Sequence, residues 1–462
     1  MRERKHQTAA LAALPAPRLF LAGLLAVLTV LIAFQARAVE VQRVVSPGGI
    51  EAWLVEDHSN PIISLDLAFQ GGAALDPAGK PGLAYMVSTL IDEGAGPLDS
   101  QSFQGTLDDF SISLRFRAGL DSFSGSLSTL SENRAKAFEL LRLALTAPRF
   151  DMEPVERIRS QILSRLSREA EDPDTVASRT LRRLMFQDHP YARPTRGTEA
   201  SIVAMTVDDL RGFVRARFAR DQLFIGVVGD ITPADLETLL DATFLPLPAE
   251  AEPFTVPEAT VANAGDVVVI EKNIPQSVVA IGQGGIKRDD PDYYAAYVVN
   301  YILGGGGFSS RLVEEVREKR GLAYSVYSYL GPLDYGALVA AGTATQNERV
   351  GESIDLIRAE WARMAEEGPS AEELEQAKRF LTGSFPLRFS SSGSIAGMLV
   401  GMQLEGLGID YLDQRNSFVE AVDLATAKRV AKELYRSEDL TMVVVGTPQG
   451  VTPTREAPAD GS

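Results

Sequence analysis

Arg317 and Tyr324 are the two side chains whose types and spacing best suit binding chemistry in this sequence. An arginine carries five N–H donors in a fixed fork, and a tyrosine carries one phenolic O–H. If the elements that carry them meet, the guanidinium and the phenol can converge on one point in space. Taken alone, the spacing of seven residues is short and common, so a solvated helix arginine followed by a core tyrosine would produce the same pattern.

Tyr324 falls on a predicted strand. The alternating stretch Ala323–Tyr329 is typical of a half-buried strand, on which Tyr324, Val326 and Ser328 are expected to share one face. Arg317 belongs to the helical segment just before it. The pair is therefore carried by two different elements that a tight turn joins.

The helix that carries Arg317 is expected to be short, with Ser309 or Ser310 as its cap and Gly321 at its stop position. A run of four glycines precedes it, and these leave the backbone almost without steric restriction. No Gly-Lys-Ser/Thr follows the run, so a close backbone approach or a hinge is indicated rather than a phosphate loop. The run consists of Gly304, Gly305, Gly306 and Gly307.

The composition is that of a soluble globular protein with an acidic surface. The chain has 462 residues and a formal net charge of −17, which becomes more negative without the basic N-terminal segment. An acidic surface argues against nucleic acid and anionic membranes as partners. The length exceeds that of one ordinary core, so at least two domains are expected.

The first 38 residues predict a secretory signal peptide. Basic residues precede the apolar run Leu19–Phe34, and Ala36-Arg37-Ala38 supplies an A-x-A cleavage site. A run of this length is short for a bilayer span, so membrane anchoring is the less favoured alternative. The chain has no cysteine, so an oxidising compartment would supply no disulfide. The periplasm is the predicted location.

The order of predicted elements repeats, which indicates two copies of one domain. LFIGVVG at Leu223–Gly229 is echoed by LTMVVVG at Leu440–Gly446, and a proline-rich stretch lies between the copies. The predicted organisation is a signal peptide (1–38), a first domain (39–248), a linker (249–257), a second domain (258–448) and a disordered tail (449–462). The fold class is α+β, with a mainly antiparallel sheet covered by helices in each domain.

The stretch LGGGGFSSRLVEEVREKRGLAYSVYS resembles the C-terminal signature of the pitrilysin/insulinase metallopeptidases, in particular their bacterial and mitochondrial-processing-type members. Further similarity at His189–Ile202, Leu223–Leu236 and Ile274–Tyr294 extends it over nearly the whole mature chain. The resemblance implies a clam-like arrangement of the two domains. It also implies that Arg317 and Tyr324 help to bind the substrate backbone near the scissile bond, beside a glycine-rich substrate loop.

Catalytic members of the family carry an H-x-x-E-H zinc motif after a G-L-A lead-in, and a distant glutamate completes the metal site. Here Gly82-Leu83-Ala84 is followed by Tyr85, Ser88 and Thr89 at the motif positions, on a helix predicted over Pro81–Asp92. The distant glutamate aligns near Ser164-Arg165-Leu166. None of these residues is acidic, and the mature chain keeps only two histidines, His58 and His189. We therefore predict no metal site.

The resemblance and the missing motif together predict a non-catalytic subunit of a heterodimeric zinc peptidase. This chain would contribute Arg317 and Tyr324, and a homologous partner subunit would hold the zinc, so peptidase activity is expected only in the complex. The substrates would be peptides, and no cofactor is expected on this chain. The alternative is a non-enzymatic peptide-binding or scaffold protein of the same fold.

Overall fold

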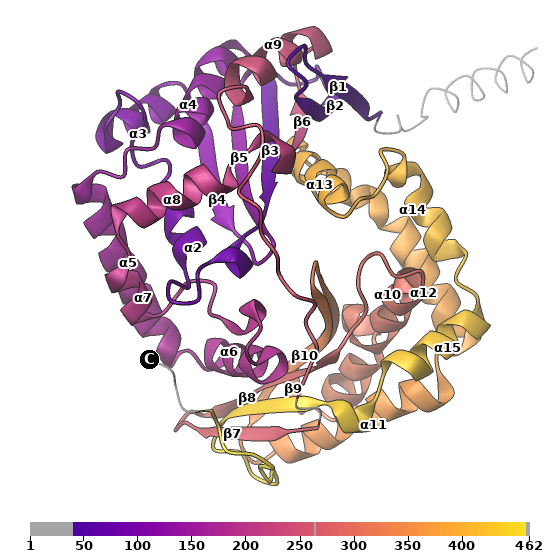
Figure 1. The fold of residues 1–462 in the computed structure, drawn as a ribbon. Helices are drawn as coiled ribbons and strands as arrows, with labels where there is room; N and C mark the ends of the chain where they lie inside the picture. The colour runs from indigo at the N-terminus through magenta and orange to yellow at the C-terminus, as the bar shows by residue number, and fades with distance from the viewer. Residues whose placement is uncertain (1–39, 263–264, 459–462) are drawn as a thin grey trace, which may run out of the picture. The chain divides into compact units, whose positions relative to one another are not determined.

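The computed structural model describes residues 40–262 and 265–458, so the predicted signal peptide lies outside the described residues. These ranges form an α+β fold with two separate sheets, as expected (Figure 1). Within the same ranges, no helix combines the length and the apolar character that a membrane span requires.

The first sheet has six strands in the order β1-β2-β6-β3-β5-β4. The strands β2 and β6 pair in parallel, and the other neighbours pair antiparallel. Strict alternation of buried and half-buried residues along β5 shows that it faces the core on one side only. The strands are β1 (Gln42–Val45), β2 (Glu51–Glu56), β3 (Ile62–Gln70), β4 (Ser113–Ala118), β5 (Ser122–Leu130) and β6 (Leu223–Gly229).

The second sheet repeats this topology with one strand fewer, in the order β7-β11-β8-β10-β9. The strands β7 and β11 pair in parallel, as β2 and β6 do, and the rest pair antiparallel. The strand β9 lies at the edge of this sheet. Its strands are β7 (Val267–Glu271), β8 (Gln276–Gly284), β9 (Ala323–Leu333), β10 (Gly336–Gln346) and β11 (Thr441–Gly446).

Helices of the first half pack on one face of the first sheet around a core that includes Leu65, Leu67 and Phe69. The Phe69 ring stacks on that of Phe218 with 4.6 Å between centroids. Each such buried side chain contributes about 1.5–3 kcal/mol relative to an exposed one. The helices are α2 (Leu83–Ser88), α3 (Ser100–Asp109), α4 (Arg134–Thr146), α5 (Met152–Glu171), α7 (Glu199–Ala204), α8 (Val207–Arg217) and α9 (Pro233–Phe244).

Helices of the second half form the corresponding layer on the second sheet. Its centre is Trp361, which is fully buried, donates from Nε1 to Oε1 of Gln283 at 2.7 Å, and meets the Tyr435 ring edge-on. A tryptophan can be buried in this way because its N–H has found an acceptor. The helices are α10 (Tyr293–Asn300), α11 (Val350–Glu367), α12 (Ala371–Gly383), α14 (Tyr411–Glu420) and α15 (Leu424–Leu434).

Two helices cross between the halves. The helix α6 (Pro173–Phe186) packs on β8 and β11 of the second sheet, and α13 (Ser392–Leu404) packs on β3 and β6 of the first. The sequence predicts a sheet covered by helices in each domain, and in the structure each sheet also carries a helix of the other half on its second face. The reason is visible in β11, whose residues are all buried, because a strand buried on both sides needs two covering layers.

Short single-turn elements connect these helices and strands. Two of them precede Arg317 and a third contains it: η5 (Tyr301–Gly305), η6 (Gly307–Ser309) and η7 (Val313–Glu318). The others are η1 (Ala73–Leu75), η2 (Ser131–Asn133), η3 (Pro190–Ala192), η4 (Arg220–Gln222), η8 (Phe385–Phe389) and η9 (Ser437–Asp439).

Part of the tail for which the sequence predicts disorder makes backbone contacts. The Thr454 N–H donates to the Val267 carbonyl of β7 at 2.8 Å, and the Val267 N–H donates to Oγ1 of Thr454 at 2.8 Å. Arg455 also pairs with Asp266 at 3.2 Å. The tail thus covers the free edge of β7, which would otherwise present unpaired backbone groups. The predicted domain boundaries stay a prediction.

Candidate functional site

Arg317 and Tyr324 lie in direct contact. Arg317 is carried by the π-helical turn η7, and its Cζ lies 5.0 Å from the centre of the Tyr324 ring. The same Cζ lies 4.6 Å from the centre of the Phe308 ring. A guanidinium in contact with two aromatic faces is held by cation–π attraction, worth about 0.5–1 kcal/mol per ring at an exposed site. The two rings therefore fix the direction of Arg317.

Tyr324 is exposed rather than part of the core. The side chain is 85% exposed, whereas Val326 and Ser328 are buried, so the three do not share one face as the sequence predicts. The cause is a β-bulge: Ala323 pairs with Thr345 and Val326 with Thr343, which leaves two residues of β9 opposite one of β10. A bulge turns the bulged residue out of the alternation of the strand. The possibility that Tyr324 is a core tyrosine is therefore wrong.

The glycine run packs tightly against β9. A Cβ on Gly304 would lie 2.6 Å from the backbone nitrogen of Ser328, and Gly307 has a φ of +57°. Two hydrogen bonds hold the contact, from Nδ2 of Asn300 to the Ser328 carbonyl at 3.3 Å and from Oγ of Ser328 to Oδ1 of Asn300 at 2.9 Å. The run thus permits the close backbone approach that the sequence indicates. Its role as a substrate loop stays a prediction.

Ser309 and Ser310 do not cap the helix that carries Arg317. Oγ of Ser309 donates to the Gly306 carbonyl at 2.9 Å, and Oγ of Ser310 donates to the Gly307 carbonyl at 2.7 Å. Both hydroxyls therefore satisfy acceptors of the glycine loop instead of N–H groups of η7. The expected cap is wrong because glycine carbonyls three residues earlier compete for the same side chains.

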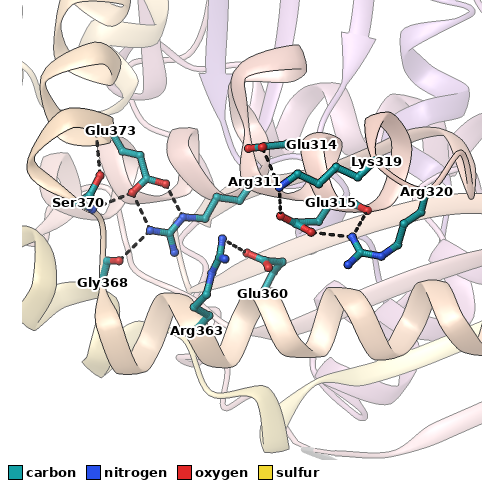
Figure 2. A network of polar contacts seen from close by, with 10 residues as sticks. All are labelled: Arg311, Glu314, Glu315, Lys319, Arg320, Glu360, Arg363, Gly368, Ser370 and Glu373. Carbon is teal, nitrogen blue, oxygen red and sulfur yellow. Dashed lines mark hydrogen bonds and ion pairs between the residues drawn. The ribbon is translucent and has the colours of Figure 1, made fainter.

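A polar network fastens the segment just before η7 to α12 and to the loop that precedes α12 (Figure 2). Arg311 binds both carboxylate oxygens of Glu373, at 2.6 and 2.7 Å, and its side chain is 8% exposed. The same guanidinium donates to the Gly368 carbonyl at 2.9 Å. Burial acts to raise the pKa of the Glu373 carboxyl, but the hydrogen bonds from Arg311 and from the Ser370 N–H outweigh it and bring the pKa down to about 2. This bidentate pair holds the start of the segment that carries Arg317.

The other end of η7 is tied by surface pairs. Lys319 contacts Glu315 at 2.7 Å and Glu314 at 3.0 Å, and Arg320 contacts Glu315 at 2.6 Å (Figure 2). These pairs lie within one short segment, so they stiffen it more than they fasten it to the rest of the protein. Within residues 40–262 and 265–458, Arg317 makes one ion pair, a 3.4 Å contact to its neighbour Glu318. Its donors therefore stay available at the surface.

The helix α2 shows how the degenerate metal-site positions are used. The helix runs from Leu83 to Ser88, shorter than predicted, and the Asp76 carboxylate accepts hydrogen bonds from the first backbone N–H groups at 2.7–3.1 Å. Oγ of Ser88 donates to the Tyr85 carbonyl at 2.8 Å, and Oγ1 of Thr89 donates to the Met86 carbonyl at 2.9 Å. Two of the three side chains therefore bond back to their own helix.

Tyr85, the third of these positions, lies against two arginines. Nη1 of Arg165 donates to its phenolic oxygen at 2.8 Å, and the guanidinium of Arg196 lies 5.8 Å from its ring centre. Arg165 belongs to the segment that aligns with the distant metal-binding glutamate. The guanidinium groups of Arg165 and Arg196 therefore lie where the catalytic relatives would have a metal ligand. Their positive charge disfavours the binding of a metal cation.

Metal-binding groups are absent from the described residues: within 40–262 and 265–458, no group of three or more His, Asp or Glu side chains is arranged to hold an ion. The two histidines in these ranges serve other contacts. His58 pairs with Asp230 at 2.7 Å, and its side chain stays exposed. His189 accepts from the Tyr191 N–H through Nδ1 and contacts the Pro257 carbonyl through Nε2, in keeping with a structural role.

Three contacts of the site escape sequence reasoning, those of Phe308 with Arg317, of Arg311 with Glu373 and of Arg165 with Tyr85. Phe308 is a 72% exposed aromatic directly after the glycine run, which is an unusual place for a large apolar side chain. Arg311 and Arg165 act through partners 62 and 80 positions away, Glu373 and Tyr85. The exposure of Phe308 leaves no signal in one sequence, and neither does a partner at that separation.

The chain matches two domains of one protein family. The model described as Insulinase (Peptidase family M16) matches residues 52–199, and the model described as Peptidase M16 inactive domain matches residues 204–381. These matches follow each other along the chain, as the internal repeat requires, and they confirm the resemblance found in the sequence.

Individual relatives agree. The non-peptidase homolog YmxG of Helicobacter pylori is 28% identical over 84% of this chain and 90% of its own length. A protein of Streptomyces coelicolor, named as an uncharacterized zinc protease, is 30% identical over 62% of this chain and 64% of its own length. The crystal structure of a peptidase M16 inactive domain from Pseudomonas fluorescens covers 90% of this chain and all of its own, with 28% identity and a TM-score of 0.83. The chain therefore belongs to peptidase family M16.

Proposed function

We propose that this chain is the non-catalytic subunit of a heterodimeric zinc peptidase of the periplasm. In this proposal it contributes Arg317 and Tyr324 to an active site whose zinc is held by a homologous partner subunit. A signal peptide over residues 1–38 would bring the chain to the periplasm. The chain itself would hold no cofactor.

One contrast carries the proposal: Arg317 and Tyr324 are in contact, with Tyr324 exposed and Arg317 half-buried, but α2 holds no set of metal ligands. The Arg317 guanidinium is held against the rings of Phe308 and Tyr324 and is ready to bind a ligand, but the described residues of this chain hold no metal site. Relatives named as zinc proteases and as a non-peptidase homolog both occur among the similar proteins. A division of one active site between two homologous chains accounts for both facts.

The geometry supports distinct roles for the two side chains. Tyr324 can donate its phenolic O–H to a scissile carbonyl as negative charge develops on the oxygen. Arg317 can bind a backbone carbonyl of the same peptide and so orient it. The strand β9 lies at a sheet edge, where an extended peptide can add as a further strand.

Co-expression with a homologue that carries H-x-x-E-H, encoded in the neighbouring reading frame, tests the proposal. The two chains should co-purify as a stable complex. The complex should cleave unfolded peptides in a chelator-sensitive way that neither chain shows alone. Full peptidase activity of the zinc-motif chain by itself, unchanged by addition of this chain, would contradict the proposal.

A second candidate is a non-enzymatic peptide-binding or scaffold protein of the same fold. The relative named as a non-peptidase homolog favours it, since that relative covers most of this chain. On this account the chain binds peptides without a zinc partner. Peptide binding by the isolated chain, combined with no gain of activity in any complex, would select it.

A further inference from the structure

Four arginines line one cavity in the first half of the chain, although the whole chain carries a net charge of −17. The cavity has a volume of about 270 Å³, and one carboxylate, that of Glu169 on α5, lies among the arginines. The hydroxyls of Thr175, Ser178 and Thr195 also line it. We call this cavity the arginine pocket. Its arginines are Arg179 and Arg182 of α6 and Arg193 and Arg196 of the loop after η3.

The positive charge of the arginine pocket is only partly neutralised. Nη1 of Arg196 binds Glu169 at 2.5 Å, and Arg179 approaches the same carboxylate at 3.9 Å. Nη1 of Arg193 donates to the backbone carbonyl of Asp76 at 2.6 Å, a neutral acceptor. One lining carboxylate thus serves two guanidinium groups, and neither Arg182 nor Arg193 forms an ion pair with a carboxylate of the described residues.

Arg182 is the arginine of this set that lacks a polar partner. It makes no hydrogen bond or ion pair with any residue in 40–262 or 265–458, yet its side chain is half-buried. Burial lowers the pKa of its guanidinium. A partly buried charge without a partner destabilises a fold, so an anion placed here would relieve an existing unfavourable state.

The surroundings of Arg182 favour an extended ligand over a lone ion. Thr175 and Ser178 line both the arginine pocket and a second cavity of about 270 Å³, so the two cavities adjoin. The second cavity reaches Tyr327 and Tyr329 on the edge strand β9, and its single carboxylate is Asp174. Arg182 also lies close enough to the Tyr329 phenol to interact with it electrostatically. A peptide can therefore run from β9 to the arginines.

We propose that the arginine pocket binds the carboxylate of an acidic side chain of a bound peptide, and that Arg182 is its principal ligand. This inference rests on the proposed function only in taking the ligand to be a peptide. It adds a substrate class, peptides with a glutamate or an aspartate, and it requires neither zinc nor a partner subunit. A guanidinium fork matches a carboxylate with two parallel hydrogen bonds.

Fluorescence anisotropy on the full chain alone tests the proposal. Two labelled, unstructured twelve-residue peptides differ only in one central residue, glutamate or glutamine. The glutamate peptide should bind about tenfold more tightly, since a hydrogen bond to a charged group is stronger than a neutral one. Arg182→Gln should remove this difference, and increasing salt should reduce it. Equal binding of the two peptides by the wild-type chain would overturn the proposal.

The matched control is Arg215→Gln. Arg215 is exposed on α8 and outside the arginine pocket, so its loss changes the net charge by the same amount and should leave the glutamate preference intact. If Arg215→Gln removes the preference as fully as Arg182→Gln does, the effect is one of net charge and the proposal fails. Arg182→Gln removes an unpaired charge and should therefore melt no earlier than the wild type, which separates lost binding from lost folding.

Inorganic phosphate distinguishes a peptide carboxylate from a free anion. In isothermal titration, phosphate should bind more weakly than the glutamate peptide, because it cannot reach β9. Phosphate binding that is as tight as peptide binding and sensitive to Arg182→Gln would overturn the assignment to a peptide. No binding of either peptide would overturn both this inference and the peptide-binding part of the proposed function, whereas binding without preference overturns this inference alone.

Discussion

Tyr85 and Tyr324 each lie beside an arginine, one in each half of the chain, but their phenols have different surroundings. The phenolic oxygen of Tyr85 accepts a hydrogen bond from Arg165, and its neighbours Ser88 and Thr89 bond to their own helix. The Tyr324 phenol makes no hydrogen bond with any residue in the described ranges and projects into solvent, while Arg317 lies against its ring. The polar side chains around Tyr85 thus have hydrogen-bond partners within the protein, whereas the Tyr324 phenol is open to solvent.

This difference separates a site that has become structural from one that is prepared for a ligand. Polar groups that already have partners within the protein gain little from a ligand, because binding would only exchange one hydrogen bond for another. The exposed phenol and the free donors of Arg317 exchange only water. Substitutions that affect the two regions unequally therefore test the comparison.

The largest expected difference is between Tyr324→Phe and Tyr85→Phe. In the complex with a zinc-bearing partner, Tyr324→Phe should lower kcat by about 10²–10³, or roughly 3–4 kcal/mol, because one donor to the developing oxyanion is lost. Tyr85→Phe should leave kcat unchanged, since that phenol only accepts from Arg165. Steady-state kinetics, with complex formation checked by size exclusion, measures both. Wild-type turnover by Tyr324→Phe would exclude this residue from the chemistry and favour the scaffold function.

Loss of the buried pair below Arg317 should mainly affect stability. Arg311→Met leaves Glu373 without its bidentate partner, and removal of one member of such a pair costs about 3 kcal/mol or more. Urea unfolding of the isolated chain measures this. The control is Arg349→Met, whose pair with Glu352 is exposed on both sides and should contribute less than about 1 kcal/mol. Equal effects of the two variants would show that the network in Figure 2 does not anchor η7.

Arg317→Ala should act on substrate binding rather than on stability. The guanidinium contacts two exposed rings and one neighbouring carboxylate, so its removal should change the free energy of unfolding by no more than about 1 kcal/mol. KM should rise about tenfold, with a smaller fall in kcat, if Arg317 binds peptide before the transition state. Arg320→Ala, three residues away, is the control and should keep the wild-type KM. A KM of wild-type value in Arg317→Ala would remove this residue from the binding site.

The comparison also has a pH-dependent part. Glu373 has a folded-state pKa of about 2, below its ordinary value near 4.5, so its ionisation stabilises the folded protein above pH 4.5. This contribution should be lost progressively as the pH falls from 4.5 to 2. The stability difference between the wild type and Glu373→Gln should accordingly be smaller at pH 3 than at pH 7. The exposed Glu372→Gln should show no such change, and a difference that is constant from pH 7 to pH 3 would contradict the assignment.

Periodicity predicts the elements well where a single rule governs them. A serine at every second position from Ser122 to Ser128 predicts a strand, and the structure has one over Ser122–Leu130 whose core lies on one side. The helix Pro81–Asp92 is predicted too long, because the Asp76 carboxylate and the Thr89 hydroxyl bind backbone groups at its two ends. These contacts depend on the positions of individual side-chain atoms, which the local pattern of apolar and polar residues does not predict.

The features that decide the site are even less accessible to local pattern. The bulge that exposes Tyr324 depends on the register between β9 and β10, and one sequence does not fix a register. The exchange of α6 and α13 between the sheets depends on which buried face each helix meets. The apolar residues on all sides of α13 do indicate burial, but they do not predict which sheet the helix packs against.

Zinc content tests the central claim, that the two parts of the active site lie on different chains. Native mass spectrometry of this chain alone, and of its complex with a zinc-motif homologue, gives the number of metal ions for each species. We predict no zinc and no peptide cleavage for this chain alone, and one zinc for each heterodimer with cleavage that a chelator abolishes. One zinc bound to the isolated chain, together with chelator-sensitive cleavage, would contradict the account.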